Sequence, residues 1–155
     1  MICVECDRLL PPSYFRKNMD ICRICTLAHK HAKEWLTVEP FSGEDLWKIG
    51  EAFRWRCAYC GKQLHPGVGN TVCFDHLMSL GTAGGYTARD NLIICCRSCN
   101  SSKNEQLPEE FCSSELMEYI YKTHPFYRQP SDIQRRTPYY RTYRREPRPM
   151  YEIES

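Results

Sequence analysis

The chain has 155 residues, which is enough for one modest domain or two small ones, and its net charge is only +2. Its mean hydropathy is −0.57, and no apolar run approaches the roughly 20 residues that span a bilayer. The first residues lack the basic flank and long apolar core of a secretory signal. We therefore expect a soluble cytoplasmic protein without membrane contact.

Cysteine is the most distinctive residue type of this chain. Eight of its eleven cysteines fall into four Cys-x2-Cys pairs, and a two-residue gap lets both thiolates of a pair reach one tetrahedral ion. Thiols stay reduced in the cytosol, which favours zinc ligation over the alternative of four disulfides. We expect the three remaining cysteines to be small buried side chains: Cys73, Cys95 and Cys112.

Residues 1–36 are predicted to form an N-terminal zinc module followed by a helix. Few of these residues can build a core, so a metal ion should supply most of the folding energy of the module. The ligands predicted for this zinc ribbon or finger follow the pattern Cys3-x2-Cys6-x15-Cys22-x2-Cys25. The module could contact DNA or bind a protein partner, and the sequence alone does not separate these roles.

The predicted helix of this first region spans residues 26–36. His29 and His31 point to different faces of such a helix, and the cysteine quartet is already complete without them. We therefore interpret both histidines as solvated or phosphate-facing. Residues 37–56 are predicted to form a linker helix, in which Ser42 is the N-cap and the apolar residues recur at three- and four-residue steps.

The third region, residues 57–107, carries the densest set of chemically useful side chains. We predict strands at 71–74 and 91–95, joined by a turn-rich loop and followed by a helix over 96–106. Two thiol pairs enclose acidic, imidazole, glycine and amide residues, in the order Cys57, Cys60, Asp75, His76, Gly84, Gly85, Asn91, Cys96, Cys99, Asn100 and Lys103. The four thiols predict a second structural zinc, whose closed shell leaves no position for water. Aspartate and asparagine can hold a hard divalent ion beside a histidine base.

This order and spacing resemble the HNH endonuclease family in its cysteine-bearing form, over about a third of the chain. The resemblance implies a ββα-metal fold, in which a hairpin and a helix surround one catalytic ion. It implies that His76 is the general base and that Asp75 and Asn100 are ligands of Mg²⁺ or Mn²⁺. Asn91 takes the place of the middle asparagine of the family, which orients the base. The products would then carry 5′-phosphate and 3′-hydroxyl ends.

Two positions depart from the family pattern, and both lie in the loop after the Asp-His pair. Ser79 stands where the family usually has proline, and the stretch from Asp75 to Gly84 is one residue longer than usual. The loop glycines are expected where the backbone turns or approaches DNA closely. Every proposed metal ligand is present, so the departures affect the expected loop shape and DNA contact more than the chemistry.

Basic residues near the motif are candidates for contact with DNA phosphates. Arg89 lies in the loop, and Arg97 and Lys103 lie in the helix that follows the second thiol pair. Ordinary solvated surface charge is the alternative interpretation of all three. His65 has no evident partner, so we interpret it as a surface residue.

The last two segments differ sharply in composition. Residues 108–127 contain a predicted helix over 114–122, with Pro108 ending the helix before it and His124 at the surface. Residues 128–155 are rich in arginine, tyrosine and proline, so we predict a basic tail that is disordered when free. Its tyrosines can stack on bases and its arginines can neutralise phosphate, notably Arg141, Arg144 and Arg145. A solubilising tail is the alternative.

These observations predict a small α+β protein, in which an N-terminal zinc ribbon or finger and a helical linker precede a zinc-stabilised ββα-metal module. The resemblance implies an endonuclease that nicks or cuts duplex DNA with two structural Zn²⁺ ions and one catalytic Mg²⁺ or Mn²⁺. The alternative is a non-catalytic zinc module that binds nucleic acid or protein in a phage or defence assembly. Small free-standing proteins of this kind resemble phage or mobile-element nucleases and also some restriction or defence nucleases, which suggests a bacterial or phage-infected cell. The target sequence, the choice of DNA or RNA and the oligomeric state stay open.

Overall fold

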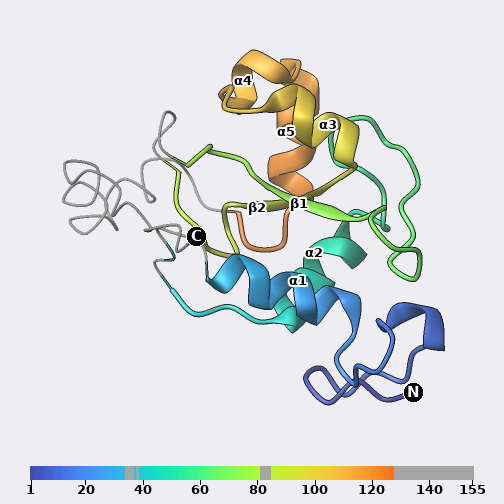
Figure 1. Ribbon diagram of the computed structural model, residues 1–155. Coiled ribbons are helices and arrows are strands. Elements are labelled where there is room, and N and C mark those ends of the chain that lie inside the picture. The colour runs from blue at the N-terminus through green and yellow to red at the C-terminus, as the bar shows by residue number, and fades with distance from the viewer. Residues whose placement is uncertain (34–36, 38, 81–84, 128–155) are drawn as a thin grey trace, which may run out of the picture.

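The computed structural model describes residues 1–33, 37, 39–80 and 85–127. A two-stranded hairpin lies at the centre, with α1 and α2 on one side of it and α3 and α4 on the other (Figure 1). The elements in chain order are η1 (Pro12–Tyr14), α1 (Arg23–Ala32), α2 (Gly43–Ala52), β1 (Cys73–His76), β2 (Leu92–Cys95), α3 (Arg97–Lys103), α4 (Pro108–Phe111) and α5 (Ser114–Thr123). This is the small α+β fold that the sequence predicts. Within the described ranges, no helix has both the length and the apolar character needed to cross a membrane.

The N-terminal module, which we define as residues 1–32, is fastened to α2 by one arginine. The guanidinium of Arg8 pairs with Glu44, lies 3.4 Å from Glu51 Oε1 and stacks 4.6 Å from the ring centroid of Trp47. The Glu44 carboxylate raises the pKa of Arg8, which therefore stays charged. A bidentate, partly buried pair of this kind holds the two elements in one orientation.

Helices α1 and α2 also touch directly. A Cβ atom added to Gly43 would lie 2.3 Å from Cys25 Sγ, so the first residue of α2 must lack a side chain for the helices to come this close. At the start of α2, the Ser42 N–H donates to Asp45 Oδ2 over 3.0 Å, which caps the helix close to the predicted position. The apolar face of α2 packs toward β2 through Leu46 and Ile49, which are fully buried.

The hairpin is antiparallel, with Cys73 opposite Cys95 and His76 opposite Leu92. All four residues of β2 are buried, whereas β1 buries its two central residues. We expected the first strand over residues 71–74. It instead begins at Cys73 and includes the Asp-His pair, which the pairing with β2 therefore holds rigidly. Helix α3 packs against β1 and so brings its own side chains to the same end of the hairpin.

The C-terminal segment differs from the sequence prediction at two residues. Helix α3 ends at Lys103, and Pro108 begins α4, because a proline at the first helical position loses no hydrogen bond. His124 is buried and not at the surface: its Nε2 donates to Leu92 O over 2.7 Å and its Nδ1 accepts from Phe126 N over 3.1 Å. Burial lowers the pKa of His124 to about 4, against a weaker opposing effect of the Leu92 bond.

Candidate active site

The cysteines of the central module converge on one point. The Sγ atoms of Cys57, Cys60, Cys96 and Cys99 all lie within 4.8 Å of one another, and the Cys60 and Cys96 sulfurs are 3.8 Å apart. A tetrahedral ion with Zn–S bonds of about 2.3 Å requires S–S edges of about 3.8 Å. None of the four forms a disulfide. The donor set therefore fits a structural zinc ion.

The cysteines of the N-terminal module form a second group of the same size. Cys3, Cys6, Cys22 and Cys25 also lie within 4.8 Å of one another, with S–S distances of 3.8 Å for Cys3–Cys25 and 3.9 Å for Cys6–Cys22. The hydrogen bond from the Cys25 thiol lowers the pKa of Cys22 to about 5, which favours its thiolate form. This second donor set also fits a tetrahedral zinc ion.

A cleft of about 560 Å³ opens at the end of β1. Three of the four side chains that the resemblance assigns to catalysis line it, namely Asp75, His76 and Asn100. The other lining residues come from the N-terminal module, the segment before β1, β1 itself and helix α3, and they are Arg16, Leu27, Lys30, His31, Asn70, Val72, Cys73, Phe74, Arg97 and Ser101. The candidate base and both ligand candidates therefore line one cleft.

His76 stands at the last position of β1, half-buried. Its Nε2 lies 2.9 Å from the hydroxyl oxygen of Thr87, which is itself fully buried. The ring of His31 meets the ring of His76 edge-on, with centroids 5.7 Å apart and an interplanar angle of 75°. Two contacts from separate parts of the chain therefore fix the plane of the imidazole. The sequence carries no signal for Thr87, and it favours a solvated or phosphate-facing His31, because neither residue belongs to the cysteine motif.

Asp75 is held by two buried side chains. The Tyr59 hydroxyl donates to Asp75 Oδ2 over 2.7 Å, and Lys103 Nζ lies 3.1 Å from the same oxygen. Burial, with the Asp75 charge, raises the pKa of Tyr59 well above its usual value, so the hydroxyl stays a donor. Within the described residues both bonds go to Oδ2, which leaves Oδ1 for a cation in the cleft. A carboxylate oxygen with the amide oxygen of Asn100 suits a hard divalent ion.

Asn91 is 1% exposed and binds only backbone, away from the cleft. Its Oδ1 accepts from Met78 N over 2.8 Å, while its Nδ2 donates to Met78 O over 3.0 Å and to Tyr86 O over 2.7 Å. Gly85 packs against the same backbone segment at Met78, since a Cβ atom added to it would lie 1.5 Å from Met78 O. The glycine therefore allows two backbone segments to meet, and the asparagine ties them together directly after His76.

Lys103 is the clearest correction to the sequence analysis. It is not a phosphate contact, because its side chain is 0% exposed and its Nζ binds Asp75 Oδ2 and, over 2.9 Å, His76 O. Arg89 does not line the cleft: it lies 3.4 Å from Asp45 Oδ1 and 4.6 Å from the ring centroid of Phe126. Arg97 is exposed and does line the cleft.

Other expectations have mixed outcomes. His29 is exposed beside Glu5, as expected, but His31 is buried, because α1 turns it toward the hairpin and not toward solvent. His65 is at the surface, and Cys95 and Cys112 are buried, as predicted. The basic tail and its candidate contacts lie outside the described residues: Arg141, Arg144 and Arg145.

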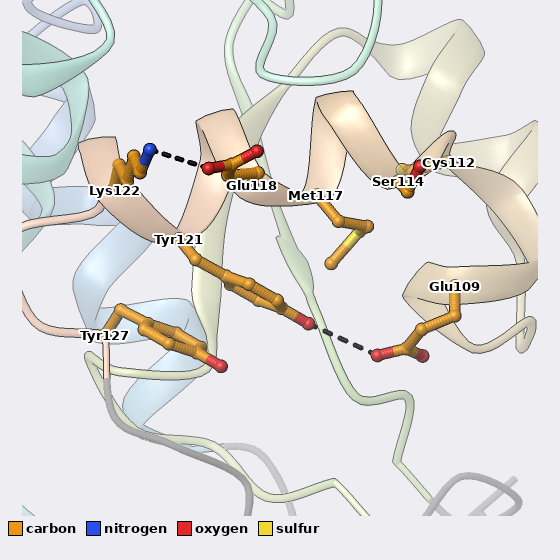
Figure 2. Close-up of a pocket in the computed structure, with 8 residues that line it drawn as sticks. All are labelled: Glu109, Cys112, Ser114, Met117, Glu118, Tyr121, Lys122 and Tyr127. Carbon is orange, nitrogen blue, oxygen red and sulfur yellow. Dashed lines mark hydrogen bonds and ion pairs between the residues drawn. The ribbon is translucent and has the colours of Figure 1, made fainter.

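A second hollow, of about 580 Å³, lies along α4 and α5 and shares no lining residue with the cleft (Figure 2). Tyr121 stacks on Tyr127 at a centroid distance of 4.1 Å, and its hydroxyl donates to Glu109 over 3.2 Å. Figure 2 also shows the ion pair of Glu118 and Lys122 on the outer side of α5. The residues that line this hollow include two tyrosines and two glutamates, and none of the proposed catalytic residues is among them.

Residues 57–106 match the family model described as HNH endonuclease. This region is an HNH endonuclease domain. The match begins at the first cysteine of the central tetrad and ends after Lys103, so it contains the hairpin, both ligand candidates and the base. The HNH domain is about a third of the chain, and the N-terminal module and α2 precede it.

No curated protein matches the chain. Among solved structures, the rare-cutting HNH restriction endonuclease PacI matches it over 76% of this chain and 89% of its own, with 20% identity and a TM-score of 0.50. A likeness at this identity shows a shared fold. Because the HNH domain is about a third of the chain, a match over 76% must include other elements, so the similarity of fold extends beyond residues 57–106.

Proposed function

We propose that this chain is a metal-dependent endonuclease that hydrolyses phosphodiester bonds of DNA. One observation carries the proposal: within an HNH domain, a histidine, an aspartate and an asparagine line a single cleft beside an exposed arginine. The similarity of fold to a restriction endonuclease supports the same class of substrate.

His76 is the general base of the proposed reaction. Imidazole is the side chain that most often serves as a general base near neutral pH. His76 takes a proton from a water molecule, whose oxygen forms a bond to phosphorus as the bond to the 3′ oxygen breaks. The leaving oxygen is protonated by solvent, which gives a 3′-hydroxyl and a 5′-phosphate. Thr87 and His31 hold the ring in position for this transfer.

Asp75 and Asn100 would hold the catalytic cation, Mg²⁺ or Mn²⁺. Such an ion neutralises charge that develops on the phosphoryl and leaving oxygens. Tyr59 and Lys103 hold the Asp75 carboxylate by its Oδ2, which leaves its other oxygen available to the cation. Arg97, exposed in the first turn of α3, can bind a non-bridging phosphate oxygen.

A supercoiled-plasmid assay tests the proposal. Wild type and His76→Ala are incubated with plasmid in Mg²⁺, in Mn²⁺ and without either ion. We expect nicking or linearisation by wild type only, and only with a divalent cation. Removing the base should reduce the rate by at least about 10²-fold.

The variant needs a check of its fold, since His76 is partly buried. Zinc content and circular dichroism of His76→Ala should equal those of wild type, because its imidazole is no cysteine ligand. Cleavage by the variant at the wild-type rate would remove His76 from the mechanism. Retained DNA binding without cleavage by either protein would favour the non-catalytic zinc module instead.

A further inference from the structure

The cleft has two walls that come from distant parts of the chain. One wall is the HNH domain, with β1 and the start of α3. The other wall belongs to the N-terminal module, which contributes Arg16 after η1 and three residues of α1, namely Leu27, Lys30 and His31. The N-terminal module therefore borders the site directly and is not a separate appendage.

The two walls are joined by contacts that leave little freedom. His31 is 6% exposed and packs its ring edge-on against His76. Lys30 of α1 and Arg97 of α3 line the cleft together with Cys73, the first residue of β1. The ion pair of Arg8 with Glu44 and the close contact of Gly43 with Cys25 hold the same module on α2.

The charge of the cleft is strongly unbalanced. Arg16, Lys30 and Arg97 are exposed and, within the described residues, form no ion pair with a carboxylate. Two of the arginines outside the cleft, Arg8 and Arg89, are paired with acidic side chains. Among the described residues that line the cleft, Asp75 is the one with a carboxylate, and it is already paired with buried Lys103. Unpaired cations on both walls of a cleft create a positive potential inside it.

We propose that the N-terminal module is the second wall of the nuclease cleft and binds the DNA backbone there, with Arg16 and Lys30 contacting phosphates that flank the one beside Arg97. The inference rests on the proposed function for its substrate, and it assigns the module a role in DNA binding over binding a protein partner. Lysine and arginine contacts to phosphate release counterions, so their effect on affinity falls as the salt concentration rises.

Binding is measured apart from cleavage. The full-length His76→Ala protein, zinc-loaded and without Mg²⁺ or Mn²⁺, is titrated onto a fluorescein-labelled DNA duplex, and anisotropy is followed over a series of NaCl concentrations. Lys30→Ala and Arg16→Ala are added separately in this background. Lys33→Ala is the matched control, because Lys33 is exposed at the end of the same helix but does not line the cleft.

We expect Lys30→Ala and Arg16→Ala each to weaken binding and to reduce the slope of log affinity against log salt by about 1. Lys33→Ala should change neither by a comparable amount. Equal effects of Lys30→Ala and Lys33→Ala would overturn the inference, as would a parent that binds no DNA. If the wild type cleaves plasmid but Lys30→Ala and Lys33→Ala change DNA binding equally, this inference alone is overturned and the nuclease proposal stands. Selective loss of binding without any cleavage by wild type would overturn only the nuclease proposal.

Discussion

The N-terminal module and the HNH domain build their cysteine sites on the same backbone frame. In each site, the backbone N–H of the first cysteine donates to the carbonyl five residues later, Cys3 N to Arg8 O and Cys57 N to Lys62 O. The carbonyl oxygen of the same cysteine accepts from the N–H four residues later, Asp7 N to Cys3 O and Gly61 N to Cys57 O. In each, the third cysteine is the N-cap of a helix, Cys22 for α1 and Cys96 for α3. Both sites therefore place two thiols at a helix N-terminus, where the helix dipole favours thiolates.

The frames differ in what lies between their cysteine pairs. Fifteen residues with one short 3₁₀ turn separate Cys6 from Cys22, whereas the segment from Cys60 to Cys96 contains the whole hairpin. The frames also differ in the distance along the chain from their last cysteine to a side chain that belongs to, or contacts, the proposed catalytic set. Asn100 follows Cys99 directly, while His31 lies six residues after Cys25, about 9 Å along α1. The comparison teaches that two cysteine sites with the same backbone frame can differ in what they carry: only the central one encloses the hairpin with the proposed catalytic residues Asp75 and His76.

Removing one thiol from each frame gives the largest expected effects and separates the two roles. Cys57→Ser should lose one zinc equivalent, the fold of the hairpin and all plasmid cleavage, because the frame directly supports Asp75 and Asn100. Cys6→Ser should lose the other zinc but retain the hairpin, with weaker DNA binding. Mass spectrometry measures the zinc content of each variant, and a plasmid nicking assay measures its cleavage. A folded, fully zinc-loaded Cys57→Ser protein would contradict the structural role of the central tetrad.

Lys103→Met tests the HNH side of the cleft without touching a cysteine. It leaves the buried Asp75 carboxylate with Tyr59 as its remaining partner, so we expect a loss of about 3 to 5 kcal/mol in the free energy of unfolding by urea. Cleavage should fall as well, because Asp75 is no longer held in one orientation. Lys62→Met, at an exposed position of the same domain, is the control and should change stability by less than about 0.5 kcal/mol. Equal stability of the two variants would contradict the buried pair.

His31 offers the corresponding test on the N-terminal side. If its ring positions His76 by contact alone, His31→Phe should retain most of the turnover rate, and His31→Ala should lower it several-fold with little change in the KM for DNA. Steady-state kinetics on a plasmid substrate measure both quantities. A His31→Phe protein as slow as His31→Ala would show that the imidazole itself takes part, and the two walls would then share the chemistry.

A last prediction concerns stability alone and rests on His124, which supports β2 from outside both frames. Its folded pKa, about 4, is depressed, so its contribution to stability is present above the unfolded value near 6.5 and is lost as pH falls toward 4. The loss is at most about 3 kcal/mol. His124→Gln retains a donor for Leu92 O without titrating there, so its unfolding free energy should vary less with pH over this window. Parallel pH profiles of the two proteins would contradict a buried neutral His124.

The sequence predicted those features that local pattern determines. The cysteine pairs, the capped helix α2, the two strands and the helix after the second pair are each encoded within a few neighbouring residues. It failed for Lys103, His31 and His124, whose burial depends on partners far along the chain. Lys103 and His76 are 27 positions apart, and His124 and Leu92 are 32 apart. One signal was available: Lys103 follows Asn100 by three residues, which places both on one face of α3.

The loop after His76 carries a last consequence of the bonds made by Asn91. Its amide joins Met78 to Tyr86, and Gly85 N donates to Ser79 O over 2.9 Å, so the two ends of the loop are closed independently of residues 81–84, which lie outside the described ranges. Once the ends of a loop are fixed, one added residue costs only a few tenths of a kcal/mol in closure entropy. The extra residue of this chain relative to the family pattern is therefore inexpensive. The bonds of Asn91 and Gly85 would therefore keep His76 in place even if the loop were lengthened by a residue.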